Sequence, residues 1–212
     1  QALKVDEIHD LTDAFGAAAE RSLAAGFEVI ELHFAHGYLA HEFLSPISNM
    51  RDDEYGGSLE NRARFALETA AKVREVIPDH LPLLVRISAS EYVDGGWDLE
   101  QSIQICKWLK DIGVDMIDAS SGGNSPAQKM ELYPGYQVPF AAAIRDQVGI
   151  ATGAVGLITE AQQAEQILAD GEADVVLLAR ELLRNPYWPL TAAHELGYDI
   201  KWPLQYERVK LE

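Results

Sequence analysis

Two observations predict an α/β fold with a parallel sheet, and a third favours a TIM barrel, the (β/α)8 fold, over an open doubly wound sheet. Short apolar runs rich in β-branched residues recur between helical stretches, and they lack the alternation of a half-exposed strand, which is typical of strands buried on both faces. The last four runs begin 33, 34 and 25 residues apart, the spacing of consecutive βα units. Polar residues and glycines follow every run, and in a barrel these loops share the face that carries the active site.

Five strands are expected, whereas a barrel has eight. Because the chain starts at Gln1 without a methionine, we expect the first three strands to precede this residue. Residues 1–212 would then be the C-terminal part, five βα units, of a single TIM-barrel domain. The expected strands cover residues 27–33, 83–88, 116–120, 150–152 and 175–179.

The segments around these strands carry helical patterns. Before the first strand, apolar residues fall on one helical face over residues 5–25, and Gly26 follows where a helix stop belongs. Ser58 occupies an N-cap position before a helix that ends ahead of Pro78. Further helices are expected at about 99–112, 136–147, 159–170 and 186–196.

Composition and charge restrict the class of protein. With 48% hydrophobic and 24% charged residues, the chain can bury a sizeable core. Its 17 basic and 34 acidic residues leave a net charge of −17, which repels phosphate backbones and anionic lipids, so no nucleic-acid or membrane partner is expected. One cysteine cannot form an internal disulfide, and no apolar run approaches the roughly 18 residues of a membrane span. These properties predict a soluble, cytoplasmic protein.

The segment around the end of the first strand is the richest in chemistry. His33 is expected to close the strand and His36 to open the loop, so both imidazoles can turn toward one pocket. Two imidazoles there could hydrogen-bond a carbonyl or nitro oxygen of a substrate and favour the charge that develops on it. Tyr38 offers a phenol that can donate a proton from the side.

Two other interpretations of this segment stay open. One is a metal-dependent barrel hydrolase with His33, His36 and His41 or Glu42 as ligands. We expect a loop here and not a helix, so the regular i, i+4 ligand face is absent and no metal site is expected. The other is that the first two histidines are polar residues satisfied at a strand end. His41, among apolar neighbours, is expected to be structural.

Arg86 stands within an otherwise apolar strand, residues 83–88. A guanidinium in a buried strand needs an anion or a ring of acceptors, because its charge cannot be titrated away. Its partner is either a carboxylate such as Glu31 on the neighbouring strand or a cofactor that carries negative charge.

A phosphate site is predicted near the C-terminal strands. Gly153 and Gly156 lie between a strand and a helix start, where they could free backbone N–H groups that hold a phosphate. Arg180 adds a cation at the end of the following strand, and the two turns together favour a monophosphate. The segment is not a dinucleotide fingerprint, because the third glycine and the downstream acid are missing.

Five short motifs follow one another along the chain. They are His33-x-x-His36-Gly-Tyr38, Phe43-Leu-Ser-Pro46, Asn49-x-Arg51, Asp53-Glu-Tyr-Gly-Gly-Ser58 and Asn61-Arg62. In this order they resemble the Old Yellow Enzyme family of FMN-dependent ene-reductases, over nearly the whole chain. The His-x-x-His form, residues 151–156 and the C-terminal Gln-Tyr-Glu-Arg are similar to the thermophilic-like branch of that family.

The resemblance implies a flavin barrel that uses NADPH or NADH to reduce an activated C=C bond in a small molecule such as an enone, maleimide or nitroalkene. His33 and His36 would hold the activating oxygen of this substrate. Reduced FMN would deliver a hydride to the β-carbon, and Tyr38 would protonate the α-carbon from the opposite face.

The resemblance also implies which residues surround FMN. Arg86 matches an arginine beside the flavin pyrimidine, where its charge favours the anionic reduced ring. Gly156, Ala179 and Arg180 match the turns that bind the phosphate. Arg208 matches a C-terminal arginine that in some relatives reaches the site of a neighbouring subunit, so a homo-oligomer is expected.

The chain departs from the family pattern in two ways. Position 179 is Ala where close relatives often have Gly, which would displace the phosphate turn slightly. The first three strands of the family supply flavin contacts and part of the substrate pocket, and this chain does not contain them. An inactive barrel fragment is therefore a third hypothesis, beside the ene-reductase and the metal-dependent hydrolase.

Overall fold

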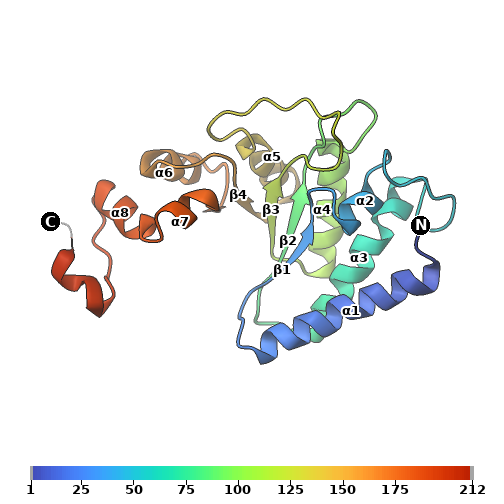
Figure 1. The fold of residues 1–212 in the computed structure, drawn as a ribbon, viewed down its shortest axis with the longest axis horizontal. Helices are drawn as coiled ribbons and strands as arrows, with labels where there is room; N and C mark the ends of the chain where they lie inside the picture. Colours follow the sequence, from blue (N-terminus) through green and yellow to red (C-terminus); the bar gives the residue numbers. More distant parts are fainter. Residues whose placement is uncertain (1, 211–212) are drawn as a thin grey trace.

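The computed structural model describes residues 2–210 and contains a sheet of five parallel strands (Figure 1). The strands lie side by side in chain order, whereas a doubly wound sheet reverses its order part-way. Chain order with a helical crossover between strands is the arrangement of a barrel wall, so the predicted fold class is confirmed. The strands are β1 (Ile30–Phe34), β2 (Leu83–Ser88), β3 (Met116–Ser120), β4 (Ala151–Ala154) and β5 (Val175–Val176).

Helices connect the strands and precede the first of them (Figure 1). They are α1 (Val5–Ala24), α2 (Leu39–Leu44), α3 (Leu59–Val76), α4 (Leu99–Ile112), α5 (Val138–Val148), α6 (Ala161–Ala169), α7 (Arg180–Arg184) and α8 (Trp188–Glu195), with a final 3-10 helix η1 (Leu204–Val209). Helix α1 packs on α3, α3 on α4 and α4 on α5, so these four form a continuous layer. Within residues 2–210 no helix is long and apolar enough to cross a membrane. The expected cytoplasmic location stays a prediction.

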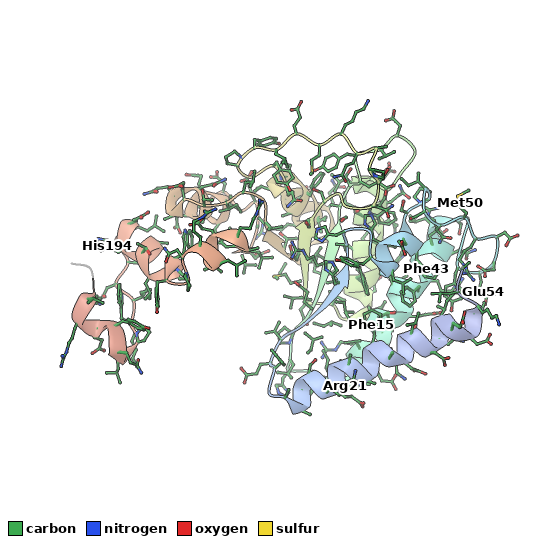
Figure 2. All side chains as sticks on the ribbon, viewed as in Figure 1. Phe15, Arg21, Phe43, Met50, Glu54 and His194 are labelled. Carbon is green, nitrogen blue, oxygen red and sulfur yellow. The ribbon has the colours of Figure 1, made fainter. Side chains whose placement is uncertain are left out.

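The core lies between this helical layer and one face of the sheet. Leu83, Val85 and Ile87 alternate along β2 and are at most 1% exposed. Phe65 of α3 belongs to the same core, and its ring centroid lies 4.8 Å from that of Phe43 on α2. Figure 2 shows where Phe43 lies on the ribbon. Burial of these side chains fixes the helices against the sheet and so sets the position of the loops at its carboxyl end.

The other face of the sheet is less covered at β1 and β2, so the expectation of strands buried on both faces is wrong for these two strands. In β3 and β4 every residue after the first is buried, as expected. In β1, Leu32 and Phe34 are buried whereas Glu31 and His33 are exposed, and Arg86 of β2 is half-buried. β1 is also an edge strand of the sheet, with no described strand on its outer side. The open face therefore presents polar side chains from successive strands.

Several predicted boundaries differ from the structure. The first strand begins at Ile30, which leaves Phe27 outside it and 64% exposed. The expected strand at 175–179 is limited to Val175–Val176. Residues 39–44, expected as a loop, form α2, because apolar residues at i, i+3 and i+4 bury one side of a short helix. The N-cap at Ser58 is confirmed, since its Oγ accepts from the Asn61 N–H (3.3 Å).

Candidate active site

His33, His36 and Tyr38 are brought together by a tight turn after β1. The Tyr38 N–H donates to the Ala35 carbonyl (3.2 Å), and both His36 (φ 60°) and Gly37 (φ 75°) are left-handed, as in a type I′ turn. The ring centroid of His33 lies 5.2 Å from that of His36 and 5.3 Å from that of Tyr38. Tyr38 is 65% exposed, so its hydroxyl is open to a ligand.

The ends of β2 and β3 fix this turn. Ser88 Oγ accepts from the His36 N–H (2.9 Å) and donates to the Gly122 carbonyl (2.8 Å). A Cβ on Gly37 would lie 2.4 Å from the Gly123 oxygen, so the close approach of the two backbones requires glycine at this position. A left-handed conformation at a residue such as His36 costs about 1–2 kcal/mol, and the surrounding contacts offset that cost.

Both histidines are neutral at pH 7. Burial and the charge of Arg86 lower the pKa of His36 to about 4, with His33 adding to the effect. The same two causes lower the pKa of His33. A neutral imidazole has one N–H that donates and one nitrogen that accepts. The pair can therefore donate hydrogen bonds to a substrate oxygen without carrying positive charge.

Gln137 links the histidine turn to the end of β4. His36 Nε2 lies 2.7 Å from Ser120 Oγ, and Gln137 Oε1 accepts from Ser120 Oγ (3.4 Å) and Ser121 Oγ (2.5 Å). The Nε2 of Gln137 donates to the Val155 carbonyl (3.1 Å). Ser120 ends β3 at the start of a polar run that the sequence shows, whereas nothing in the sequence pattern brings Gln137 to the site.

Arg86 and Asp118 form an ion pair on the open face of the sheet. In the sheet register His33 lies opposite Arg86, and Arg86 lies opposite Asp118. Arg86 Nε is 3.1 Å from Asp118 Oδ2, but the angle between them does not allow a hydrogen bond. Arg86 Nε is therefore buried without a hydrogen-bond partner among the described residues, and the same holds for Asp118 Oδ1. Arg86 therefore has a carboxylate partner on a neighbouring strand, as one interpretation expects, but this partner is Asp118 and not Glu31. A signal for Asp118 did exist, because each member of the pair stands two residues before the serine that ends its strand.

Asp118 should make stability depend on pH. Burial raises the pKa of this carboxyl from 3.8 to about 7, against the opposing charge of Arg86, and Glu31 adds to the rise. Because the folded state binds the proton more tightly than the unfolded state, stability falls as pH rises from about 4 to about 7. Asp118→Asn removes that loss. The difference in unfolding free energy between the variant and the wild type should therefore be about 2–3 kcal/mol larger, in favour of the variant, at pH 8 than at pH 5. Urea unfolding of both proteins measures this gain, and an equal difference at the two pH values would contradict it.

The residues expected to bind a phosphate border one cavity at the carboxyl ends of β4 and β5. Its volume is about 250 Å³, and Gly156, Ala179 and Arg180 border it together with Arg86 and Arg184. Glu181 also borders the cavity and pairs with Arg184, so Arg86 and Arg180 leave its lining with a net positive charge, which favours an anionic ligand.

Gly156 shapes one side of this cavity. Its backbone has a φ of 128°, which residues other than glycine rarely adopt, and a Cβ there would lie 3.1 Å from side-chain atoms of Tyr136 and Gln137. Its N–H donates to no backbone carbonyl within residues 2–210. The N–H is therefore free to donate to a ligand, as in turns that bind anions through the backbone.

Arg208 is not part of this arrangement. It is exposed on η1, at the end of a C-terminal arm that extends away from the sheet (red in Figure 1). Its expected role at the site of a neighbouring subunit stays a prediction.

The ligands of a metal-dependent hydrolase do not converge. His41 is buried on α2, and its Nδ1 accepts the Gly37 N–H (3.0 Å), so this nitrogen is already engaged. Among residues 2–210 no group of three or more His, Cys, Asp or Glu side chains is placed to hold a metal ion. His33 and His36 form a pair without a third ligand.

The sequence matches the family model described as the NADH:flavin oxidoreductase / NADH oxidase family over residues 1–199. The chain belongs to this family. The NADPH dehydrogenase of Bacillus cytotoxicus is 55% identical over 207 residues, which cover 98% of this chain and 59% of the relative. That of Geobacillus sp. (strain WCH70) is 57% identical over 202 residues, which cover 95% of this chain and 58% of the relative. The chain thus spans about three fifths of the length of these curated relatives.

Solved structures of this NADH:flavin oxidoreductase family share the fold. The Old Yellow Enzyme homologue of Zymomonas mobilis superposes with a TM-score of 0.76 at 27% identity, over 97% of this chain and 57% of that protein. Morphinone reductase superposes with a TM-score of 0.75 at 27% identity, over 96% of this chain and 53% of that protein. The predicted kinship with Old Yellow Enzymes is confirmed, and the predicted cofactors, FMN with NADPH or NADH, are those of the family.

Proposed function

We propose that this chain carries the site of an FMN-dependent ene-reductase, which uses NADPH or NADH to reduce the activated C=C bond of an enone, maleimide or nitroalkene. The observation that carries the proposal is the convergence of a neutral histidine pair, the exposed phenol of Tyr38 and an arginine-lined cavity at one end of the sheet. An oxygen-binding pair beside a proton donor and an anion site suits the reduction of a carbonyl-activated alkene. The name of the curated relatives, NADPH dehydrogenase, supports a nicotinamide donor.

We also propose that residues 1–212 are the C-terminal part, five βα units, of a single barrel domain. The support is a sheet in chain order with an open edge at β1, together with relatives that are longer than this chain. In a closed barrel, the open face that carries His33 and Arg86 would become the lining of the interior.

The residues present fit FMN. Gly156, Ala179 and Arg180 would hold its phosphate, since they border one small cavity with cationic walls. Arg86 would contact its ring, because the guanidinium has a buried Nε that lacks a hydrogen-bond partner among the described residues. When bound, FMN supplies the hydride that reduces the alkene.

His33 and His36 bind and polarise the substrate. With ring centroids 5.2 Å apart, both imidazoles can reach one carbonyl or nitro oxygen. His36 Nε2 is engaged by Ser120 Oγ, so Nδ1 is the nitrogen left for the substrate oxygen. It donates in the Nδ1–H tautomer, in which the Ser120 hydroxyl turns its proton from Gln137 Oε1 to His36 Nε2. Two N–H donors stabilise the negative charge that develops on this oxygen during reduction.

Tyr38 supplies the proton. Its ring packs edge-on against His33, with an interplanar angle of 61°, which keeps the phenol beside the oxygen-binding pair. The hydroxyl donates its proton to the carbon next to the activating group and regains one from solvent, to which it is open.

We further propose a homo-oligomer in which Arg208 approaches the site of a neighbouring subunit. The C-terminal arm carries large apolar side chains that are exposed, Leu183 at 84%, Leu204 at 77% and Val209 at 64%. Exposed apolar side chains of this size support a surface that another chain covers.

Anaerobic incubation of the whole protein with FMN, NADPH and 2-cyclohexenone tests the proposed activity. We expect one cyclohexanone for each NADPH oxidised. A protein that oxidises NADPH in air but leaves the alkene unreduced would contradict the ene-reductase proposal. The metal-dependent hydrolase predicts no NADPH oxidation and an activity lost to chelators, and the inactive fragment predicts no turnover at any FMN concentration.

A further inference from the structure

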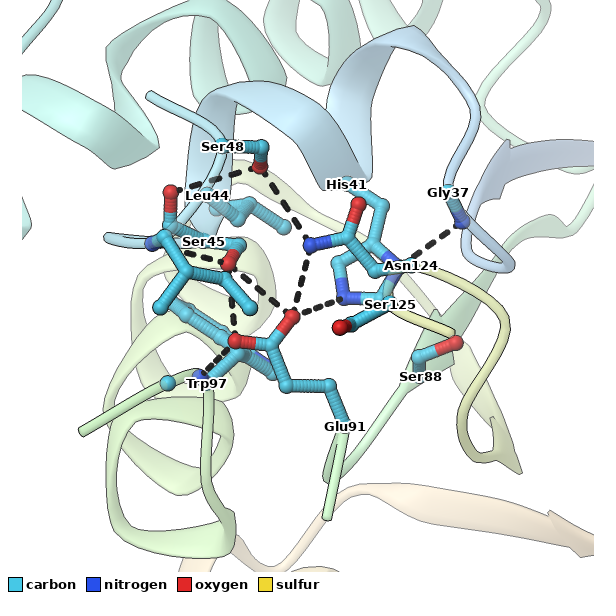
Figure 3. A network of polar contacts seen from close by, with 12 residues as sticks. Gly37, His41, Leu44, Ser45, Ser48, Ser88, Glu91, Trp97, Asn124 and Ser125 are labelled. Atoms are coloured by element: carbon cyan, nitrogen blue, oxygen red, sulfur yellow. Dashed lines mark hydrogen bonds and ion pairs between the residues drawn. The ribbon is translucent and has the colours of Figure 1, made fainter. Parts of the chain in front are cut away.

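Glu91, in the connection that follows β2, is a fully buried carboxylate. Ser45 Oγ donates to both of its oxygens (2.8 and 2.9 Å), the Trp97 N–H to Oε1 (2.5 Å) and Asn124 Nδ2 to Oε2 (2.6 Å) (Figure 3). A Cβ on Gly96 would lie 2.1 Å from Oε1, so the chain wraps closely around this group. A buried carboxylate is costly unless donors surround it, and here the donors come from the connections after β1, β2 and β3.

His41 is the ring that faces this carboxylate (Figure 3). Its Nδ1 accepts the Gly37 N–H (3.0 Å), so the neutral ring carries its proton on Nε2, which lies 3.8 Å from Glu91 Oε2. Burial lowers the pKa of His41 to about 4, against the opposing charge of Glu91, so the ring is neutral at pH 7. The negative charge beside Nε2 favours the tautomer with the proton on that nitrogen.

The Gly37 N–H is the middle amide of the turn that carries His36 and Tyr38. The amide before it donates to Ser88 Oγ, and the amide after it closes the turn. The Gly37 N–H has an acceptor in only one tautomer of His41. If the proton were on Nδ1, the N–H groups of Gly37 and of the His41 ring would face each other. The turn therefore depends on where the proton of His41 lies.

We propose that Glu91 is a positioning residue for the active-site turn. Glu91 selects the Nε2–H tautomer of His41, which holds the Gly37 N–H and with it His36 and Tyr38. Glu91 does not border the arginine-lined cavity, so it acts through His41 and not by contact with FMN. The effect on the reaction rests on the proposed function, whereas the hydrogen bond from Gly37 does not.

The test compares Glu91→Gln with Ser102→Ala in the whole, FMN-loaded protein. Glutamine keeps the shape of Glu91 and removes its charge. Ser102→Ala removes another buried hydrogen bond at the end of β2, from Ser102 Oγ to the Ala89 carbonyl (2.9 Å), and leaves His41 untouched. Amide hydrogen exchange at Gly37 and the 15N shifts of the His41 ring report the link directly, because neither depends on turnover.

In Glu91→Gln we expect the Gly37 amide to exchange about tenfold faster and a second tautomer of His41 to become populated. Single-turnover alkene reduction should slow about tenfold in Glu91→Gln and less than about twofold in Ser102→Ala. Unchanged exchange and tautomer in Glu91→Gln would overturn the proposal, as would equal changes in the two variants. A wild-type protein without ene-reductase activity would contradict the proposed function. The exchange rate at Gly37 would then still decide whether Glu91 positions the turn.

Substitutions of His41 test the same link from the other end. The Oδ1 of asparagine can accept the Gly37 N–H without depending on a tautomer, so the double variant Glu91→Gln/His41→Asn should exchange at Gly37 within about twofold of the wild type. Exchange as fast as in Glu91→Gln alone would contradict the tautomer link. Should Glu91→Gln not fold, His41→Leu removes the acceptor, and an unchanged Gly37 exchange rate in that variant would equally overturn the proposal.

Discussion

Replacing Tyr38 by phenylalanine is expected to slow the reduction of 2-cyclohexenone about 10²-fold, because the variant loses the proton donor and keeps the ring. Tyr38 is 65% exposed and packs edge-on against His33, a contact that phenylalanine retains. The fold and the binding of FMN should therefore not change. Stopped-flow measurement of the two half-reactions separates the steps, and we expect reduction by NADPH to keep its wild-type rate.

Tyr198→Phe is the matched control for this substitution. Tyr198 is 61% exposed after α8, on the C-terminal arm, so loss of its hydroxyl should leave both half-reactions unchanged. If Tyr38→Phe reduces cyclohexenone within about twofold of the wild-type rate, Tyr38 is not the proton donor.

Arg86→Met is expected to lower the two-electron potential of bound FMN by about 30–60 mV, which corresponds to about 1.4–2.8 kcal/mol. The reason is that a cation in a partly buried site stabilises negative charge on a reduced ring more than on an oxidised one. The affinity for FMN should fall about tenfold as well, because the guanidinium also borders the phosphate cavity. A redox titration and a binding titration of the variant measure the two effects.

The same substitution removes the counter-ion of Asp118. Breaking a buried ion pair costs about 3–5 kcal/mol when the remaining charge cannot be neutralised. Since the pKa of Asp118 is already raised to about 7, this carboxyl can take up a proton, and we expect a loss of only about 1–2 kcal/mol at pH 7. The double variant Arg86→Met/Asp118→Asn should recover the stability but not the potential. Recovery of both would mean that Arg86 acts on the flavin through Asp118, and an unchanged potential in Arg86→Met would contradict a contact with the ring.

The sequence predicts those elements whose ends are marked locally. Helix α4 begins and ends at the expected residues, because the Asp98 side chain accepts from the Gln101 N–H (3.0 Å) and Gly113 adopts the left-handed conformation (φ 101°) that stops a helix. The apolar run before β1 carries no such signal, so its strand was placed three residues too early. Burial on both faces is wrong for β1 and β2 for a related reason, since an apolar run does not reveal whether another segment covers the second face of its strand.

The residues of the candidate site also differ in how far the sequence predicts that they come together. His33, His36 and Tyr38 stand close together in the sequence, so their grouping could be predicted from spacing alone. Asp118 reaches Arg86 through the register of two strands, and Gln137 reaches Ser120 from the N-cap of α5. Contacts of this kind depend on how distant segments pack, which a single sequence does not contain.

In the proposed function, the carboxyl ends of β1 to β5 form the FMN site of a reductase. Titration of FMN into the whole protein, followed by its visible absorption, tests this most directly. We expect one FMN per chain, with an affinity that falls about tenfold in Arg180→Ala and again in Arg86→Met. A whole protein that binds no FMN, or binds it equally well after both substitutions, would contradict the claim.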